Sequence, residues 1–363
     1  MITGLRQRYP HVRVAALGGP ALSQAGAQLL WNLTALSVVG FAEVLKNYRL
    51  FKVLFEAMVL WIRKYRPRHL CFVDYPGFNL RLAERLCKEG LTRKGGGTIG
   101  AFYYISPQVW AWKGARRFQM ARCLDALAVI FPFEVDFFKD TDLPVTFVGH
   151  PFVREGFQLT VRYESGGPLL LLPGSRKAAV GRIFPLMLAA LEHRLAEYPE
   201  QAALVVYPDH TIRMLLERLI ARRLVRVREH LKLVPDTIQT AGGAVLTSSG
   251  TMSLACALAG LPGAIVYRVH PFTYFWARRL VRVPFLGIAN ILLKKPVYPE
   301  YIQGQARPKR LAGELQKCLE DTKRLTTIRQ AAVCLHAELK GQGALAPEVW
   351  LERSMDLIPA KNT

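Results

Sequence analysis

Acidic residues are scarce in this chain. Its 363 residues include 27 Asp and Glu against 49 Lys and Arg, which gives a formal net charge of +22. Such an excess of positive charge favours an anionic partner, which can be nucleic acid, anionic lipid or a phosphorylated substrate. Hydrophobic residues make up 51% of the chain and charged residues 21%, so the composition excludes a disordered protein. The length of 363 residues predicts two domains of ordinary size.

Long apolar runs, a signal sequence and paired cysteines are also missing. The best candidate for a membrane span, 51–62, contains Lys52 and Glu56 and is too short to cross a bilayer. Residues 1–6 do not contain the apolar segment that directs secretion. The six cysteines form no CxxC pair, which favours free thiols in a reducing compartment over a zinc site. We therefore expect a cytoplasmic protein that contacts the inner face of a membrane peripherally.

Common signatures of cofactor and metal sites are absent too. The sequence has no Walker loop and no GxGxxG, and its eight histidines show no spacing typical of metal ligands. Asp140 and Asp142 have the DxD spacing of some metal-dependent transferases, but they directly precede Leu143-Pro144, which predicts a solvated loop. The prediction is a protein that needs neither metal nor cofactor.

What the sequence does contain is a regular alternation of strand and helix signals. Short apolar runs of strand type alternate with amphipathic segments, and this rhythm predicts an α/β fold with parallel, doubly wound sheets. A pause near 149–151 and a loose Gly-Pro segment at 163–168 separate two such series, so we predict domains at 1–160 and 161–363, the second with a helical tail. The predicted strands include 12–17, 69–74, 98–105, 126–131, 169–172, 203–207, 243–247 and 263–266, and the predicted helices include 42–65, 79–89, 180–197, 212–222 and 252–259.

Two strand–turn–helix segments in the second domain have the form of phosphate sites. In LLLLPGSRKAAV, Gly174 and Ser175 start a helix beside the fixed cation of Arg176. In LTSSGTMSLA, Ser249, Gly250 and Thr251 offer hydroxyl and N–H groups at a second helix start. Each can also be an ordinary turn and helix cap. Two of them in one domain favour a ligand that carries a diphosphate.

Three segments of the first domain leave two interpretations open. Asp74 follows a predicted strand and can be a general base or a turn cap, and capping is favoured, while Asn79 can cap the next helix. The stretch 103–122 places tryptophans beside Lys and Arg, which suits nucleic acid, lipid headgroups or a core aromatic beside a solvated helix. In 36–68, apolar and basic residues are mixed as in an interfacial membrane element or a half-buried helix; its candidate membrane-facing residues are Val38, Val39, Phe41, Leu45, Leu50 and Phe51.

Taken in order, these motifs resemble those of the lipid-A-disaccharide synthase family. The most specific are SPQVWAWK (106–113) and YRVHPFTY (267–274). The resemblance covers nearly the whole chain, and its other matching stretches are SVVGFAEVL (37–45), VDYPGFNLRLA (73–83), FPFEVDFF (131–138), VTFVGHP (145–151), LLPGSR (171–176), SSGTMSL (248–254) and PVYPEYIQ (296–303).

The resemblance implies a GT-B fold, in which two Rossmann-like domains face a cleft. It implies a metal-independent, inverting transfer from UDP-2,3-diacylglucosamine to 2,3-diacylglucosamine 1-phosphate at the inner membrane surface. It makes Asp74 the base candidate and gives Arg176 the leaving diphosphate, while Arg268, Asn290 and Gln303 match positions that bind substrate. Nucleic acid is not an expected partner, and the helical tail is compatible with exchange of C-terminal segments in a homodimer.

Three departures from the family pattern bear on activity. The chain starts inside the first helix, so the N-terminal domain is expected to lack its first strand and its glycine-rich loop. Ala179 and Ala255 stand where the family has acids, and the second of these acids typically holds the ribose hydroxyls. The hypotheses, in order, are an active synthase with a start placed too late, a non-catalytic relative that binds UDP-sugar or lipid, and a nucleic-acid-binding protein. A GT-B transferase for another acylated sugar is the nearest enzymatic alternative.

Overall fold

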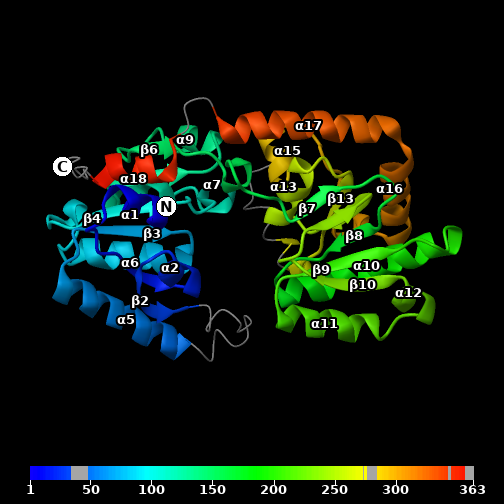
Figure 1. The fold of residues 1–363 in the computed structure, drawn as a ribbon, viewed down its shortest axis with the longest axis horizontal. Helices are drawn as coiled ribbons and strands as arrows, with labels where there is room; N and C mark the ends of the chain where they lie inside the picture. Colours follow the sequence, from blue (N-terminus) through cyan, green and yellow to red (C-terminus); the bar gives the residue numbers. More distant parts are fainter. Residues whose placement is uncertain (34–47, 273, 276–283, 342–344, 356–363) are drawn as a thin grey trace. The chain divides into compact units, whose positions relative to one another are not determined.

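The computed structural model describes residues 1–33, 48–272, 274–275, 284–341 and 345–355, and the chain divides into two compact units. Unit 1 comprises Met1–Pro151 and Leu339–Thr363, and unit 2 comprises Phe152–Glu338. Each unit is built on parallel strands with helices between them (Figure 1). The predicted α/β class with parallel sheets is therefore confirmed.

Unit 1 contains a four-stranded parallel sheet of order β3-β4-β5-β6 and a separate parallel pair, β1-β2. The predicted strands at 69–74, 98–105 and 126–131 correspond to β3, β4 and β5. The elements of this unit are α1 (Ile2–Arg8), β1 (Ala15–Gly18), α2 (Pro20–Gln24), β2 (Gln28–Asn32), α5 (Tyr48–Tyr65), β3 (His69–Val73), α6 (Pro76–Lys88), β4 (Gly100–Tyr104), α7 (Val109–Trp112), α8 (Arg116–Cys123), β5 (Ala126–Val129), α9 (Phe133–Phe137), β6 (Val145–Phe147) and α18 (Pro347–Met355).

The two faces of the unit 1 sheet are covered by different helices, because successive side chains of a strand point to opposite faces. Ala101 and Tyr103 of β4 belong to a core cluster with α5, α6 and α8. Phe102 and Tyr104 belong to a second cluster with α1 and α18. Strand β4 is thus buried on both faces, as expected for the interior of a parallel sheet.

The end of the helical tail packs in unit 1, not in the C-terminal domain to which the sequence assigned it. Trp350 of α18 is one of the largest fully buried side chains, and its ring centroid lies 6.2 Å from that of Tyr104. Leu351 and Met355 join Leu5 of α1 in the same cluster. This apolar stripe of α18 covers one face of β4 and β5. Among the described helices, α1 shares that face with it.

Unit 2 is built on a six-stranded parallel sheet of order β10-β9-β8-β12-β13-β14. From β8 the chain moves outward through β9 to β10, and from β12 it moves outward through β13 to β14, so the direction reverses between β8 and β12. Its elements are β7 (Val161–Tyr163), β8 (Leu169–Leu172), α10 (Lys177–Glu197), β9 (Ala203–Tyr207), α11 (His210–Ile220), α12 (Val225–Glu229), β10 (Leu231–Pro235), β11 (Thr240–Gly242), β12 (Ala244–Thr247), α13 (Thr251–Leu258), β13 (Gly263–Tyr267), α15 (Ile288–Leu293), β14 (Glu300–Ile302), α16 (Pro308–Glu320) and α17 (Thr322–Lys340).

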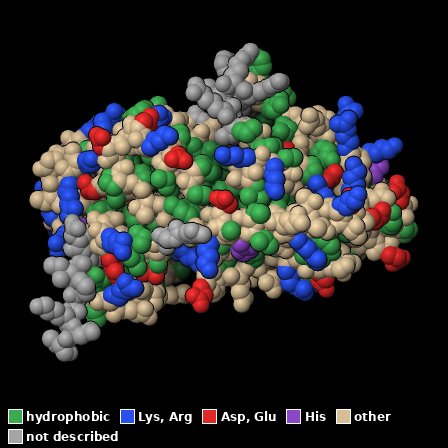
Figure 2. Space-filling model, turned by 90° about the horizontal axis from the view of Figure 1, so that it is seen from above, with side chains coloured by type: hydrophobic (Ala, Val, Ile, Leu, Met, Phe, Trp, Pro, Cys, Tyr) green, Lys and Arg blue, Asp and Glu red, His purple; other side chains and the backbone are tan. Residues whose placement is uncertain are grey.

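The positive charge of the chain is spread over its surface. On the face seen in Figure 2, Lys and Arg side chains are scattered across the surface, with acidic side chains between them. None of the helices in the described parts of the chain is both long enough and apolar enough to cross a membrane.

Candidate functional site

The reversal between β8 and β12 places two turns side by side at the carboxyl edge of the unit 2 sheet. Ligands of open α/β sheets bind in the crevice that such a switch point leaves outside the strand ends. The Ser248 N–H donates to the Leu172 carbonyl at 2.9 Å, which ties the two turns together. Gly174 has a φ of 101°, and a Cβ added there would lie 2.9 Å from Ser248 Oγ. A glycine is therefore required where the turns meet.

Both turns start a helix whose first amides have no side-chain cap. Arg176 is the N-cap of α10 and Gly250 is the N-cap of α13, and neither makes a capping hydrogen bond from a side chain. Uncapped N–H groups at a helix start attract anions. Ser175, Arg176 and Thr251 are exposed beside them. The structure thus brings together the predicted phosphate-binding residues Gly174, Ser175, Arg176, Ser249, Gly250 and Thr251.

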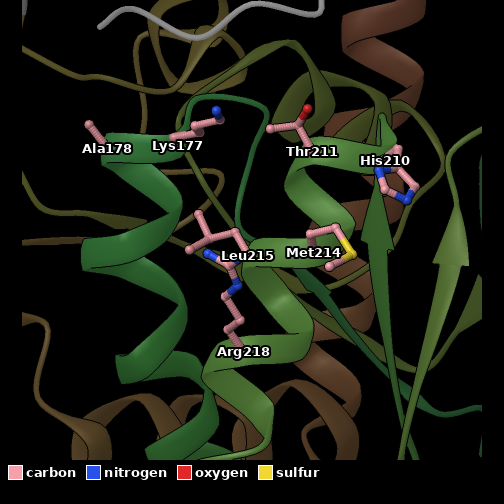
Figure 3. Close-up of a pocket in the computed structure, with 7 residues that line it drawn as sticks. All are labelled: Lys177, Ala178, His210, Thr211, Met214, Leu215 and Arg218. Atoms are coloured by element: carbon pink, nitrogen blue, oxygen red, sulfur yellow. The ribbon is translucent and has the colours of Figure 1, made fainter.

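A basic pocket adjoins the first of these turns. It has a volume of about 520 Å³ and lies between the first turns of α10 and α11, with Lys177 directly after Arg176 on its rim (Figure 3). The Lys177 side chain points toward Thr211, and the Arg218 side chain rises between the two helices beside Leu215 (Figure 3). No acidic side chain lines the pocket. This lining suits an anionic group beside the turn at Arg176.

A second pocket, of about 620 Å³, contains two of the predicted substrate-binding residues, Arg268 and Gln303. Arg182 of α10 also lines it, so two guanidinium groups face the same space. Gln303 has a φ of 51° and bonds both backbone groups of Val269, with Oε1 accepting at 3.1 Å and Nε2 donating at 3.2 Å. Gln303 therefore fixes the loop that carries Arg268. Arg182 was not predicted from the sequence as a residue of this pocket. It lies four residues before Leu186, so both side chains are on the face of α10 that lines the pocket, and this helical spacing could have indicated it.

Asn290 was predicted to bind substrate, but the structure gives it a structural role. Its side chain is fully buried, and its Nδ2 donates to the Tyr298 carbonyl and to Glu300 Oε1, both at 2.8 Å. Its Oδ1 accepts from the Tyr298 N–H at 2.9 Å. Every polar atom of the amide is thus engaged inside unit 2, where it joins α15 to β14.

We expect Asn290→Ala to destabilise the protein by about 3 kcal/mol, because it leaves the Tyr298 backbone groups buried without partners. Urea unfolding of both proteins would measure the loss as a shift in midpoint. The control is Gln305→Ala, since Gln305 is an exposed amide in the same unit. Equal midpoints for Asn290→Ala and the wild type would contradict the structural role.

In unit 1, Asp74 lies in a strained turn at the carboxyl end of β3. Asp74 and Tyr75 have φ values of 44° and 45°, a left-handed conformation that is costly for two successive residues with side chains. Asn79 holds the turn, with Nδ2 donating to the carbonyls of Val73 at 3.0 Å and Asp74 at 2.8 Å. The Tyr103 hydroxyl also donates to the Asp74 carbonyl, at 2.5 Å. Strain of this kind concentrates at functional sites.

The predicted capping roles of Asp74 and Asn79 are not what the structure shows. The N-cap of α6 is Tyr75, and no side chain caps this helix. The Asp74 side chain is exposed and has no hydrogen bond or ion pair among the described residues. Asn79 binds the carbonyls of the turn instead of the amides of the helix. Asp74 is therefore held by its backbone with its carboxylate available.

In the aromatic and basic stretch 103–122, the structure shows the tryptophan Trp110 packed in an aromatic cluster. Trp110 is half-buried and packs edge-on against Phe133, with ring centroids 4.9 Å apart, and its Nε1 donates to Glu134 Oε1 at 3.0 Å. Arg117 is paired with Asp140, one of the two residues with DxD spacing. Among the described side chains, no three His, Cys, Asp or Glu residues converge as metal ligands do.

Comparison with known proteins identifies the family. The family model for lipid-A-disaccharide synthetase matches residues 1–346. The chain belongs to the lipid-A-disaccharide synthetase family. It is 33% identical to the lipid-A-disaccharide synthase of Nitrosococcus oceani, with all of this chain and 93% of that protein covered. It is 32% identical to the enzyme of the same name from Geobacter sulfurreducens, with 94% and 88% covered.

Solved structures show the same fold at low sequence identity. The calicheamicin glycosyltransferase CalG4 is 15% identical with a TM-score of 0.55, covering 96% of this chain and 93% of that one. The UDP-bound MnaA of S. aureus is 10% identical with a TM-score of 0.58, covering 99% and 93%. These likenesses confirm the GT-B fold class. The lipid-A-disaccharide synthetases are glycosyltransferases, and the predicted family and enzyme class are confirmed for this member.

The two alanines that depart from the family pattern lie in apolar surroundings. Ala255 is 2% exposed in α13, a helix whose residues from Ser253 to Leu258 are all buried. Ala179 is half-buried against the core formed by α10 and the strands. Alanine packs well at both places. This member of the family thus lacks a carboxylate at either position, and along α13 the hydroxyl groups nearest in sequence to Ala255 belong to Ser253 and Thr251.

The predicted membrane-facing residues are only partly visible. Val38, Val39, Phe41 and Leu45 lie outside the described residues. Leu50 of α5 is 44% exposed, whereas Phe51 is half-buried and packs against the unit 1 core, which removes it from the lipid-facing set. The structure adds Val53 and Leu60, which are 64% and 59% exposed. Val53 and Leu60 follow Leu50 by three and ten residues, which places all three on one face of the helix. This spacing could have indicated them as lipid-facing candidates from the sequence.

Proposed function

We propose that this chain transfers the diacylglucosamine group of UDP-2,3-diacylglucosamine to 2,3-diacylglucosamine 1-phosphate, giving a lipid A disaccharide 1-phosphate and UDP. Family membership supports the reaction. The observation that carries the donor half is the pair of uncapped helix starts at the β8–β12 switch point, with Arg176 at the start of α10. A diphosphate fits two such turns, because each offers free N–H groups to one phosphate.

The proposed chemistry needs a base for the acceptor and cations for the leaving diphosphate. The Asp74 carboxylate removes the proton of the acceptor hydroxyl as its oxygen attacks the anomeric carbon. The bond from that carbon to the diphosphate oxygen breaks, and negative charge grows on the departing UDP. Arg176 and the amides at the starts of α10 and α13 stabilise that charge, so the transfer inverts the anomeric centre without a metal. Arg268, set by Gln303, adds a cation to the unit 2 site.

A turnover assay tests this proposal. The purified chain is incubated with both lipid substrates in detergent micelles containing EDTA, and released UDP and disaccharide are quantified. We expect the two products in equal amounts. Binding of UDP without its release from the sugar donor would contradict the proposal and favour a non-catalytic relative, which the alanines at 179 and 255 would then explain. Turnover only with a differently acylated sugar would reassign the substrate.

The proposal includes a cytoplasmic protein bound peripherally to the anionic inner membrane and associated as a homodimer, without nucleic acid. The exposed apolar residues Leu50, Val53 and Leu60 on α5 support the membrane contact. They are flanked on the same helix by Arg49, Lys52, Arg63 and Lys64, which are exposed. An apolar stripe bordered by cations suits the boundary between headgroups and acyl chains of an anionic bilayer.

We expect the double variant Val53→Asp/Leu60→Asp to bind anionic vesicles at least about tenfold more weakly than the wild type, because it loses apolar contact and gains charge repulsion. Cosedimentation with phosphatidylglycerol vesicles measures this. The double variant Val225→Asp/Val333→Asp is the matched control, since Val225 and Val333 of unit 2 are 55% and 71% exposed and the charge change is the same. Equal losses in the control would mean that net charge alone governs binding and that α5 makes no specific contact.

A further inference from the structure

Glu134 is an acidic residue buried among aromatic rings at the carboxyl edge of the unit 1 sheet. Its side chain is fully buried, and it lies in the first turn of α9, just after β5. Oε1 accepts from Trp110 Nε1 at 3.0 Å, and Oε2 accepts from the Phe131 N–H at 3.1 Å. Buried carboxyl groups are rare and are costly unless bonded, so this one needs an explanation.

The two hydrogen bonds of Glu134 join two loops that follow neighbouring strands. Trp110 belongs to the segment 105–113 after β4, and Phe131 belongs to the loop after β5. The rings reinforce the joint, since Phe133 packs against both Trp110 and Phe131, and Phe131 stacks on His150 at 5.5 Å. β4 and β5 are adjacent in the sheet, so the segments that follow them leave the sheet side by side. Glu134 supplies the polar contacts between these two segments.

The segment 105–113 continues directly from the residues that hold the Asp74 turn. Tyr103, whose hydroxyl donates to the Asp74 carbonyl, lies two residues before Ile105, which has a φ of 67°. From there the chain runs to the Trp110 anchor and exposes Gln108 on the way. Because the Asp74 N–H donates to the Tyr104 carbonyl at 3.1 Å, a shift of Trp110 would act on the chain that adjoins the Asp74 turn.

Among the residues that the structure describes, none forms an ion pair with Glu134. Burial raises the pKa of this carboxyl to about 8, while the N–H donors of Phe131, Trp110 and Ile130 act in the opposite direction. The charged groups on the neighbouring elements are engaged elsewhere or exposed: Arg117 of α8 is paired with Asp140, Asp136 of α9 is exposed, and His150 stacks on Phe131. The ionised carboxylate accepts from both donors more strongly than the protonated acid, whose own O–H proton would meet two groups that are themselves donors.

We infer that Glu134 is a positioning residue of the proposed transfer, which fixes the segment 105–113 beside the Asp74 turn by holding the Trp110 indole. It touches no substrate. Its effect on activity rests on the proposed function, whereas its effect on the segment does not. In this role the carboxylate must be ionised, so kcat/KM rises with pH through the range in which Glu134 loses its proton.

The test compares Glu134→Gln, Trp110→Phe and their double variant, with Asp136→Asn as the control for loss of one acid from α9. Glutamine keeps the shape of Glu134 but directs an N–H₂ group at one of the two donors. Phenylalanine keeps the ring against Phe133 and removes the indole N–H. Hydrogen–deuterium exchange of the peptide 105–116 reads the segment directly, and steady-state kinetics over pH 6 to 9 read its effect on transfer.

We expect faster exchange in 105–116 for Glu134→Gln and Trp110→Phe, with no change for Asp136→Asn. We expect a roughly tenfold rise in KM for the lipid acceptor with a smaller change in kcat, loss of the pH dependence near 8, and a double variant no worse than the single ones because both act through one bond. Unchanged exchange and an unchanged pH profile in Glu134→Gln, even with a lowered melting temperature, would overturn the inference. Should the wild type show no turnover, the proposed function fails and the exchange data alone decide the role of Glu134.

Discussion

Replacing Arg176 by alanine should lower kcat by about 10²- to 10³-fold, because a fixed cation at the departing diphosphate is lost from a site that is proposed to work without a metal. Arg176 is exposed at the start of α10 and has no ion-pair partner among the described residues, so the fold should not depend on it. Affinity for UDP should fall less than kcat, since the charge that Arg176 meets is largest in the transition state.

The measurement is initial-rate UDP release together with UDP binding by calorimetry. Arg176→Lys should recover part of the loss, because it restores the charge without the forked donor geometry. Arg222→Ala is the matched control, since Arg222 is exposed just beyond the C-terminal end of α11, at the opposite edge of the unit 2 sheet. Equal losses in kcat for Arg176→Ala and Arg222→Ala would remove Arg176 from the chemistry.

Replacing Asp74 by asparagine should lower kcat by about 10²- to 10⁴-fold, the usual contribution of a general base. Asparagine suits this test because it tolerates the left-handed conformation that Asp74 adopts, with a φ of 44°. The hydrogen bonds that the Asn79 and Tyr103 side chains donate to the Asp74 carbonyl do not depend on the replaced atoms. The variant should therefore fold, bind UDP normally and fail at the proton transfer.

Thermal unfolding and UDP binding check that Asp74→Asn retains its fold and its donor site, and UDP release measures kcat. Asp136→Asn supplies the control for the same chemical change at an exposed site of unit 1. Turnover within a few-fold of the wild type would show that Asp74 serves only the geometry of its turn, and another group would then have to accept the proton.

The sequence predicted the central strands closely and the outer ones poorly. The strands at 169–172 and 203–207 are β8 and β9 with the same bounds, because continuous apolar runs are the signal of strands buried on both faces. β10 and β14 were not predicted. β14 is three residues long and half-buried, and β10 contains Lys232 and ends at Pro235, so neither shows a clean pattern.

For the site residues, the sequence predicted where in the fold a residue lies better than it predicted what its side chain does. Gly174, Ser175 and Arg176 could be placed because a strand, a glycine and a helix start are visible as a pattern. The role of Asn290 could not be, since whether an amide points into a core or toward a ligand depends on residues distant in sequence, here Tyr298 and Glu300. Glu134 gave one overlooked signal, an acid placed directly after Phe131-Pro132-Phe133 in the aromatic run FPFEVDFF.

The packing of Trp350 has a consequence for the order in which the protein folds during synthesis. Unit 2 is one continuous stretch, Phe152–Glu338, so all of its strands have left the ribosome before α18 is made. Unit 1 is discontinuous, and the face of β4 and β5 around Tyr104 stays uncovered by α18 until residues 347–355 emerge. Domains generally fold as units during translation. Unit 2, although encoded second, is therefore completed first, and unit 1 is the last to close its core.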